Sequence, residues 1–272
     1  MKILLDTDIG GDVDDALALA LALRSPEIDI IGISLVYIAN EWRANILKNM
    51  LQVYGREDIP FVIGAEKPIV GYWGDAPPNL KDNTAAEFII SQCDNNPDLV
   101  LVPIGPLTNI AAAFAAAPRI AQGRKVMIMG GALNQARAEW NIFCDPEAAS
   151  IVLESGADIH MVGLNVTERC QFTSQEVSAF DNSVPEGKLM GDMIDKFIKD
   201  YNYLPILHDP LTVASLIWDD LLTFETKKIA VELKGLFSRG FLVEAESGAK
   251  VNIATNVNDM LFKQRLLERI RK

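Results

Sequence analysis

The sequence predicts a single α/β domain with a mostly parallel, open, Rossmann-like sheet flanked by helices. Apolar segments of strand length alternate with helical segments at least five times, which is typical of a parallel sheet covered on both faces. The 272 residues suffice for a large core, and no repeat, low-complexity stretch or convincing linker divides them. We therefore expect residues 1–272 to form one domain.

Local composition justifies each expected element of the first part of the chain. The strands are apolar runs such as 28–36 (IDIIGISLV) and 99–104 (LVLVPI), whereas the helices carry apolar residues at helical spacing. Residues 64–82 are rich in Gly and Pro, and we expect them to form a long loop, which in a compact domain is often functional. We expect strands at 2–5, 28–36, 60–63, 99–104, 125–129 and 159–164, and helices at 16–23, 42–54, 84–93, 107–117 and 146–155.

The alternation changes beyond Gln171. Helical spacing comes first, then three short strand-like pieces (KIAVEL, RGFLV and KVNIA), and finally a terminal helix. We expect helices at 174–181, 186–202, 210–218 and 257–271, and strands at 229–233, 239–243 and 250–254.

Composition excludes several classes of partner. A net charge of −12 disfavours a nucleic-acid backbone. No apolar run reaches membrane-spanning length and the N-terminus shows no signal-peptide pattern, so we expect a cytoplasmic protein that makes no membrane contact. The three cysteines have no metal-ligand spacing and are odd in number, which favours reduced thiols.

The most unusual stretch is DTDIGGDVDDALAL at residues 6–19, where a turn between the first expected strand and helix is crowded with carboxylates. So many like charges repel each other unless a cation lies among them, and oxygen ligands suit Ca²⁺ or Mg²⁺. One or two aspartates at a helix start usually act as caps, but five are too many for capping alone. An EF-hand loop is excluded, because Leu17 stands where a bidentate Glu is required. The five aspartates are Asp6, Asp8, Asp12, Asp14 and Asp15.

Further polar or unusual residues follow the expected strands, at the edge where open parallel sheets bind ligands. Each also has an ordinary interpretation. Asn40 and Asn165 suit turns, and Met129 is more often a core residue. Asp209 alone suits a helix cap, and a single histidine such as His208 is usually structural. The full set is Asn40, Gly105, Met129, Gly130, Gly131, Glu139, Trp140, Asn141, Asn165, His208 and Asp209.

Four motifs in a fixed order give these residues a common interpretation. DTDIGGDVDDALAL, VPIGPLTNIA, MGGALN followed by AEWNIFCDPEAA, and LHDPLTVA occur in the order seen in nucleoside N-ribohydrolases. The chain thus resembles the inosine–uridine preferring nucleoside hydrolase family from Met1 to about Ala214. The resemblance implies the nucleoside hydrolase fold and an N-glycosyl hydrolase acting on purine or pyrimidine nucleosides. It also implies a Ca²⁺ ion at the bottom of a ribose pocket and a homodimer or homotetramer.

The resemblance also implies roles for single residues. Asp8 would be the general base that activates a metal-bound water, and His208 would supply a proton to the leaving base. The implied Ca²⁺ ligands are Asp8, Asp15, Asp209 and the backbone carbonyl of Ile104. The residues implied at the substrate are Asp14, Asn40, Met129, Asn134, Glu139, Trp140 and Asn141. By location alone, we expect the base pocket to draw on Tyr72, Trp73, Tyr201 or Tyr203.

Departures from the family pattern keep other interpretations open. The family usually reads DTDxGxDDA, whereas DTDIGGDVDDA carries two extra residues, and the additional carboxylate of Asp12 has no assigned role. The chain is also shorter than typical members in segments that shape the base pocket. Two alternatives are a hydrolase for a modified or nicotinate riboside and a non-catalytic ribose- or metal-binding module. A Mg²⁺-dependent phosphatase of the haloacid dehalogenase class is disfavoured, because no lysine motif accompanies Asp6.

Overall fold

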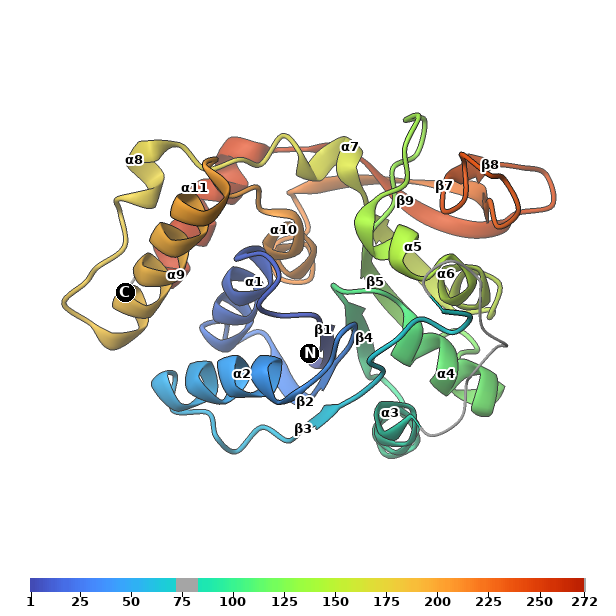
Figure 1. Ribbon diagram of the computed structural model, residues 1–272, viewed down its shortest axis with the longest axis horizontal. Coiled ribbons are helices and arrows are strands. Elements are labelled where there is room, and N and C mark those ends of the chain that lie inside the picture. Colours follow the sequence, from blue (N-terminus) through green and yellow to red (C-terminus); the bar gives the residue numbers. More distant parts are fainter. Residues whose placement is uncertain (72–82, 272) are drawn as a thin grey trace.

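One mixed sheet runs through the part of the chain that the computed structural model describes, residues 1–71 and 83–271 (Figure 1). Its strand order is β3-β2-β1-β4-β5-β6-β9-β7-β8. The strands from β3 to β9 in this order pair in parallel, while β7 pairs antiparallel with β8 and β9. The strands are β1 (Lys2–Thr7), β2 (Asp29–Leu35), β3 (Phe61–Ile63), β4 (Val100–Pro103), β5 (Lys125–Met129), β6 (Asp158–Val162), β7 (Leu222–Val231), β8 (Leu242–Glu244) and β9 (Ala249–Val257). The predicted mostly parallel open sheet is confirmed.

Helices cover both faces of this sheet. Figure 1 shows α1, α2 and α9 to α11 on one side of the sheet, and α3, α4 and α6 on the other. The helices are α1 (Asp14–Leu23), α2 (Glu41–Val53), α3 (Thr84–Asn95), α4 (Thr108–Ala116), α5 (Trp140–Cys144), α6 (Pro146–Leu153), α7 (Leu164–Thr167), α8 (Ser174–Val177), α9 (Pro185–Tyr201), α10 (His208–Ala214) and α11 (Asp259–Ile270), with a 3-10 turn at Pro118–Ile120.

The strand β1 shows how one sequence supplies two cores. Side chains alternate between the faces of a strand, so Ile3 and Leu5 join the core beneath α1 and α2, while Leu4 joins the core beneath α3 and α4. All three side chains are fully buried. The alternating Ala and Leu residues of α1 are buried on every side because α10 and α11 also pack against α1.

The strand order places a ligand site between β1 and β4. Reading outward from these two strands, the chain runs to β2 and β3 on one side and to β5 and β6 on the other. Ligands bind at such a switch point, beyond the carboxyl ends of the strands. Asp8 follows β1 there, and Gly105 follows β4. A β-carbon on Gly105 would lie 2.7 Å from the Asp8 Oδ1 atom, so glycine is required for the close approach of these two turns.

Several predicted boundaries were wrong. The strand predicted at 229–233 begins earlier, at Leu222, and the strand predicted at 239–243 begins later, at Leu242. In β7 the half-exposed Lys227 stands next to the exposed Lys228, and these two charged residues obscure the strand pattern in the sequence. The short helices α5 and α7 were not predicted, because four or five residues are too few to show helical periodicity. Tyr72 and Trp73 lie outside the described residues.

Two findings bear on the predictions made from composition. Cys93, Cys144 and Cys170 are buried free thiols that form no disulfide. Burial raises the pKa of their thiols to about 11, 12 and 12, respectively, so these cysteines are unreactive at neutral pH. Among the described residues, no helix combines the length and the apolar character needed to cross a membrane.

Candidate active site

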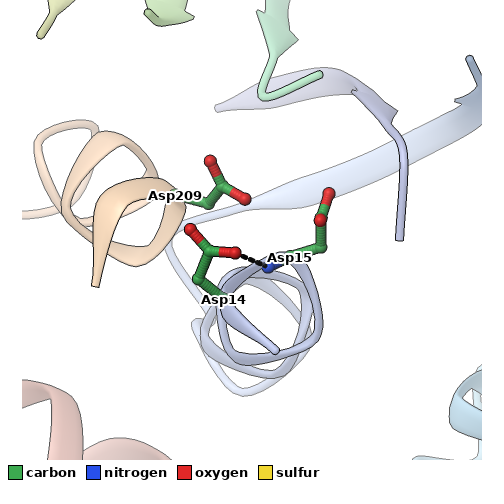
Figure 2. A group of neighbouring side chains, drawn as sticks. All are labelled: Asp14, Asp15 and Asp209. Atoms are coloured by element: carbon green, nitrogen blue, oxygen red, sulfur yellow. Dashed lines mark hydrogen bonds between the residues drawn. The ribbon is translucent and has the colours of Figure 1, made fainter. Parts of the chain in front are cut away.

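Three buried carboxylates meet at the first turns of two helices. Asp14 and Asp15 begin α1, and Asp209 lies in the first turn of α10, which packs against α1. One oxygen from each carboxylate lies within 4.8 Å of the other two. Figure 2 shows the carboxylates of Asp14 and Asp209 facing each other with that of Asp15 beside them, and the Asp14 Oδ1 atom accepts a hydrogen bond from the Asp15 backbone N–H at 3.2 Å. Three oxygen donors at this spacing can hold a hard divalent cation.

The electrostatics of this cluster support a metal site. Burial raises the pKa values of Asp14, Asp15 and Asp209 well above that of a free aspartate, and repulsion among the neighbouring carboxylates raises them further. A divalent cation would remove both penalties, because it would compensate the buried negative charge. The donor set therefore fits the group that the sequence motifs imply. It includes Asp14, which was predicted to bind ribose.

Asp8 lies beside this cluster in the same cavity. Burial raises the pKa of its carboxyl group to about 7, although the nearby Arg43 guanidinium lowers it. An Arg43 Nη2 atom lies 3.9 Å from the Asp8 Oδ2 atom, and Nη1 donates to the backbone carbonyl of Ile9 at 2.8 Å. A carboxyl group that titrates near neutral pH is suited to accepting a proton from water.

Two further side chains, Asp6 and Thr7, stabilise the turn that follows β1. The Asp6 Oδ1 atom accepts hydrogen bonds from Ser34 Oγ at 2.5 Å and from Asn109 Nδ2 at 2.8 Å. The Thr7 hydroxyl donates to the Asp15 carboxylate at 2.5 Å and accepts from the backbone N–H of Ile9. Asp6 is fully buried and absent from the cavity wall, so its hydrogen bonds support the turn and do not contact the cavity.

The two extra residues of the turn leave the carboxylate cluster intact. Asp12 is partly exposed at the cavity wall, and its carboxylate accepts a hydrogen bond from the backbone N–H of Val13. The Tyr201 hydroxyl on α9 donates to the Gly11 carbonyl at 3.3 Å. The longer turn thus reaches out to α9, while Asp14 and Asp15 keep their places at the start of α1.

The residues predicted near the ribose form one polar wall of the cavity. Glu139 caps α5, and its buried carboxylate accepts from the backbone N–H groups of Asn141 and Ile142. Burial raises the pKa of Glu139 despite these hydrogen bonds. The Asn141 Nδ2 atom donates to the Ile104 carbonyl at 2.8 Å and lies 3.4 Å from the Met129 sulfur. The Ile104 carbonyl keeps a second lone pair for a further ligand.

Aromatic side chains also line the cavity. Trp140 is 57% exposed and packs edge-on against Tyr37 and at a tilt against Phe143. Tyr201 and Tyr203 also line the cavity, as does His208. Burial lowers the pKa of His208 to about 4, so its ring is neutral at pH 7. The cavity measures about 840 Å³, which is a size typical of small-molecule sites.

The structure brings most, but not all, of the predicted site residues together. Asn40 is exposed and caps α2, with its Oδ1 atom accepting from Trp42 N at 3.0 Å and Arg43 N at 3.2 Å. Asn134 is exposed on a loop, with a φ of 61°. Neither side chain lines the cavity. The residues that do line it are Asp8, Asp14, Asp15, Ile104, Met129, Glu139, Trp140, Asn141, His208 and Asp209.

Sequence reasoning missed three charged residues of the cavity wall. Arg43 comes from α2, while Arg137 and Glu168 form an ion pair in the cavity wall. No sequence signal could have found them, because isolated Arg and Glu residues outside a motif are usually solvated surface residues.

Comparison with known proteins identifies this arrangement. The family description "inosine-uridine preferring nucleoside hydrolase" matches residues 3–264 of the chain. The chain belongs to this family. It is accordingly a nucleoside N-ribohydrolase, as the four sequence motifs predicted.

Individual relatives of this nucleoside hydrolase span nearly its whole length. It is 32% identical over 271 residues to uridine nucleosidase 1 of Arabidopsis thaliana, covering 86% of this chain and 79% of that protein. It is 33% identical over 276 residues to the pyrimidine-specific ribonucleoside hydrolase RihA of Escherichia coli, covering 89% of this chain and 88% of the other. The solved structure of a purine-preferring ribonucleoside hydrolase from Gardnerella vaginalis superposes with a TM-score of 0.86 at 31% identity, covering 100% of this chain and 98% of that one.

Proposed function

We propose that this nucleoside hydrolase cleaves the N-glycosidic bond of a ribonucleoside in a Ca²⁺-dependent reaction that yields free base and ribose. The observation that carries the proposal is the buried carboxylate cluster next to Asp8, in a cavity lined by both polar and aromatic side chains. We further propose that the protein is cytoplasmic and forms a homodimer or homotetramer, as the family resemblance implies.

The carboxylates are suited to holding the ion. From the motifs, its ligands would be Asp8, Asp15, Asp209 and the Ile104 carbonyl, and the geometry adds Asp14 as a candidate. The bound cation would orient a water molecule and lower its pKa. Ca²⁺ accepts six to eight oxygen ligands in flexible geometry, so it accommodates carboxylates, a carbonyl and sugar hydroxyls together.

The chain's own residues divide the rest of the reaction. Asp8 accepts a proton as the water oxygen forms a bond to the anomeric carbon and the bond to the base nitrogen breaks. The neighbouring carboxylates stabilise the positive charge that develops on the sugar. Glu139 and Asn141 orient the ribose hydroxyls, and His208 donates a hydrogen bond to the departing base. Aromatic rings such as Trp140 and Tyr201 offer stacking surfaces to that base.

The preferred base is left to a substrate panel. The similar proteins are named for uridine, pyrimidine and purine preferences, and the cavity wall of this chain includes the additional Asp12 carboxylate. The second candidate is a hydrolase for a modified or nicotinate riboside, because the chain is shorter than typical family members in the segments that shape the base pocket. The non-catalytic alternative loses its support, because the extra residues do not displace Asp14 or Asp15.

The decisive experiment replaces the proposed base. Asp8→Ala should lower hydrolysis of inosine, uridine, cytidine and adenosine alike by about 10²–10⁴-fold, the usual contribution of a general base, as measured by release of reducing sugar. Asp192→Ala is the matched control, because Asp192 is an exposed partner of Lys188 on α9. Undiminished activity of the Asp8 variant, with its fold intact, would exclude this mechanism.

A further inference from the structure

A buried hydroxyl contacts the imidazole ring from behind the cavity wall. Thr167, the last residue of α7, is fully buried. Its Oγ1 atom lies 2.7 Å from the Nδ1 atom of His208, the first residue of α10. His208 lines the cavity, whereas Thr167 does not. Thr167 therefore touches His208 on the side away from the space that a substrate would fill.

The direction of this hydrogen bond follows from the proton count. A threonine hydroxyl has one proton, and a neutral imidazole carries one proton on either Nδ1 or Nε2. Among the described residues, the Thr167 hydroxyl makes no hydrogen bond other than the one to Nδ1. If Nδ1 carried the ring proton, the hydroxyl proton would be buried without an acceptor, which native structures avoid. The hydroxyl therefore donates, Nδ1 accepts, and the ring proton lies on Nε2.

The opposite ring nitrogen is then available to a ligand. Within residues 1–71 and 83–271, no protein atom forms a hydrogen bond to His208 Nε2 through a side chain or the backbone. Because Nδ1 is occupied by Thr167, Nε2–H is the polar group that the ring can present to the cavity.

We propose that Thr167 is a positioning residue that fixes His208 in the Nε2–H form, so that the ring presents a hydrogen-bond donor to the departing base. This inference rests on the proposed function, in which His208 serves the leaving group. A neutral imidazole with a fixed N–H can stabilise developing negative charge without becoming an imidazolium. Without Thr167, the ring could rotate or present its unprotonated nitrogen to the base.

A pair of substrates separates positioning from a merely structural role. Thr167→Val keeps the shape of the side chain and removes the hydroxyl, whereas Thr167→Ser keeps the hydroxyl. For a ribonucleoside such as inosine or uridine, Thr167→Val should lower kcat by about 10- to 100-fold, the usual effect of losing a group that orients an active-site residue. Its KM should stay within about 3-fold of the wild-type value. A 4-nitrophenyl riboside leaves as a stabilised phenolate that needs no proton, so its hydrolysis should change by less than about 3-fold.

The control variants sharpen the kinetic result. Thr167→Ser should retain activity within about 3-fold on both substrates, because its hydroxyl can still donate. In the double variant, Thr167→Val should add nothing to the loss caused by His208→Ala, because the two residues act as one unit. Equal losses of Thr167→Val on both substrates, or no loss on either, would overturn the proposal.

A spectroscopic measurement tests the same inference without activity. The chain has two histidines, so a long-range ¹H–¹⁵N correlation spectrum shows two imidazole patterns, and His160→Asn assigns them. The wild-type protein should show His208 protonated on Nε2, and Thr167→Val should show a mixture or the Nδ1–H form. An Nδ1–H form in the wild-type protein would contradict the proposal even if Thr167→Val did not fold. Failure of the proposed function would instead appear as wild-type protein that cleaves no riboside.

Discussion

Arg43 is a buried cation placed against two groups of the acidic turn. It is 4% exposed, donates to the Ile9 carbonyl at 2.8 Å and lies 3.9 Å from the Asp8 carboxylate. One nitrogen, Nε, has no hydrogen-bond partner among the described residues. The guanidinium thus compensates part of the negative charge around Asp8 and fixes the course of the chain after β1.

Arg43→Met should therefore impair both stability and catalysis. The Ile9 carbonyl would lose its donor, which costs about 1–3 kcal/mol of unfolding free energy, and the carboxyl group of Asp8 would be protonated more readily, which should lower hydrolysis at pH 7 on the order of 10-fold. Urea denaturation and reducing-sugar assays measure the two effects. Arg56→Met is the control, because its ion pair with Asp58 lies at the surface and contributes at most about 1 kcal/mol. Equal effects of the two substitutions would contradict this role for Arg43.

At the residue scale, the sequence could predict the carboxylates but not their cationic partner. Asp8, Asp14 and Asp15 lie within one motif, and their density alone indicated a cation site. Arg43 is distant in the chain and belongs to a helix whose other charged residues, such as Glu41 and Lys48, pair at the surface. Contacts of this kind depend on how α2 packs beside the turn, which local sequence does not encode.

At the element scale, the start of α2 depends on Asn40. Its Oδ1 atom accepts hydrogen bonds from two backbone N–H groups of the first turn, and its Nδ2 atom makes no hydrogen bond to another described residue. Capping and the predicted contact with a ribose hydroxyl would therefore use different atoms of the same amide.

Two substitutions separate these roles of Asn40. Asn40→Ala removes the cap and should cost about 0.5–2 kcal/mol of stability. Asn40→Asp keeps an effective capping oxygen but removes the amide donor, so it should leave stability within about 0.5 kcal/mol while raising KM for ribonucleosides. Urea denaturation and initial-rate kinetics provide the two readouts. An unchanged KM in Asn40→Asp would show that Asn40 serves the helix and not the sugar.

The element order was predictable because buried parallel strands leave a strong signal. The apolar runs that became β1, β2 and β4 are hidden from water on both faces, and the helices between them show apolar spacing. The signal fails for β7, where exposed and half-exposed residues alternate and Lys227 stands beside Lys228. It also fails for α5, which exists because Glu139 caps it and not because its five residues favour a helix.

At the scale of the whole molecule, distant parts of the chain converge on one buried charge cluster. Asp209 arrives on α10, which packs against α1 on one face of the sheet, while Asp8 follows the central strand β1. The hydrophobic periodicity of the sequence did not predict that α10 packs against α1. The pairing was implied by the family resemblance of the LHDPLTVA motif, and the fold shows its physical basis in helix packing.

This buried charge makes the stability of the metal-free protein depend on pH. Burial raises the pKa values of Asp6 and Asp8 to about 7, and those of Asp14, Asp15 and Asp209 are raised well above the ordinary value. In the unfolded chain these groups ionise near pH 4. Above that pH the folded state therefore binds more protons, and its stability falls as pH rises through the folded pKa values. His208 acts in the opposite direction between pH 4 and about 6.5, because its folded pKa is lowered to about 4.

Above pH 6.5 the opposing effect of His208 diminishes, so the aspartates dominate the pH dependence between pH 6.5 and 8. With the metal chelated by EDTA, the melting temperature should fall across this interval, because the buried aspartates are forced to ionise next to one another. Ca²⁺ should raise the melting temperature more at pH 8 than at pH 5, since at low pH it must displace protons from the same oxygens. Asp209→Asn removes one carboxylate of the cluster and should reduce both the pH dependence and the Ca²⁺ shift, whereas Asp192→Asn on exposed α9 should change neither. Thermal melting with and without Ca²⁺ measures all of these effects. Two results would contradict this account of the carboxylate cluster. One is a melting temperature of the metal-free protein that rises from pH 6.5 to 8, and the other is an undiminished increase in melting temperature on adding Ca²⁺ to Asp209→Asn.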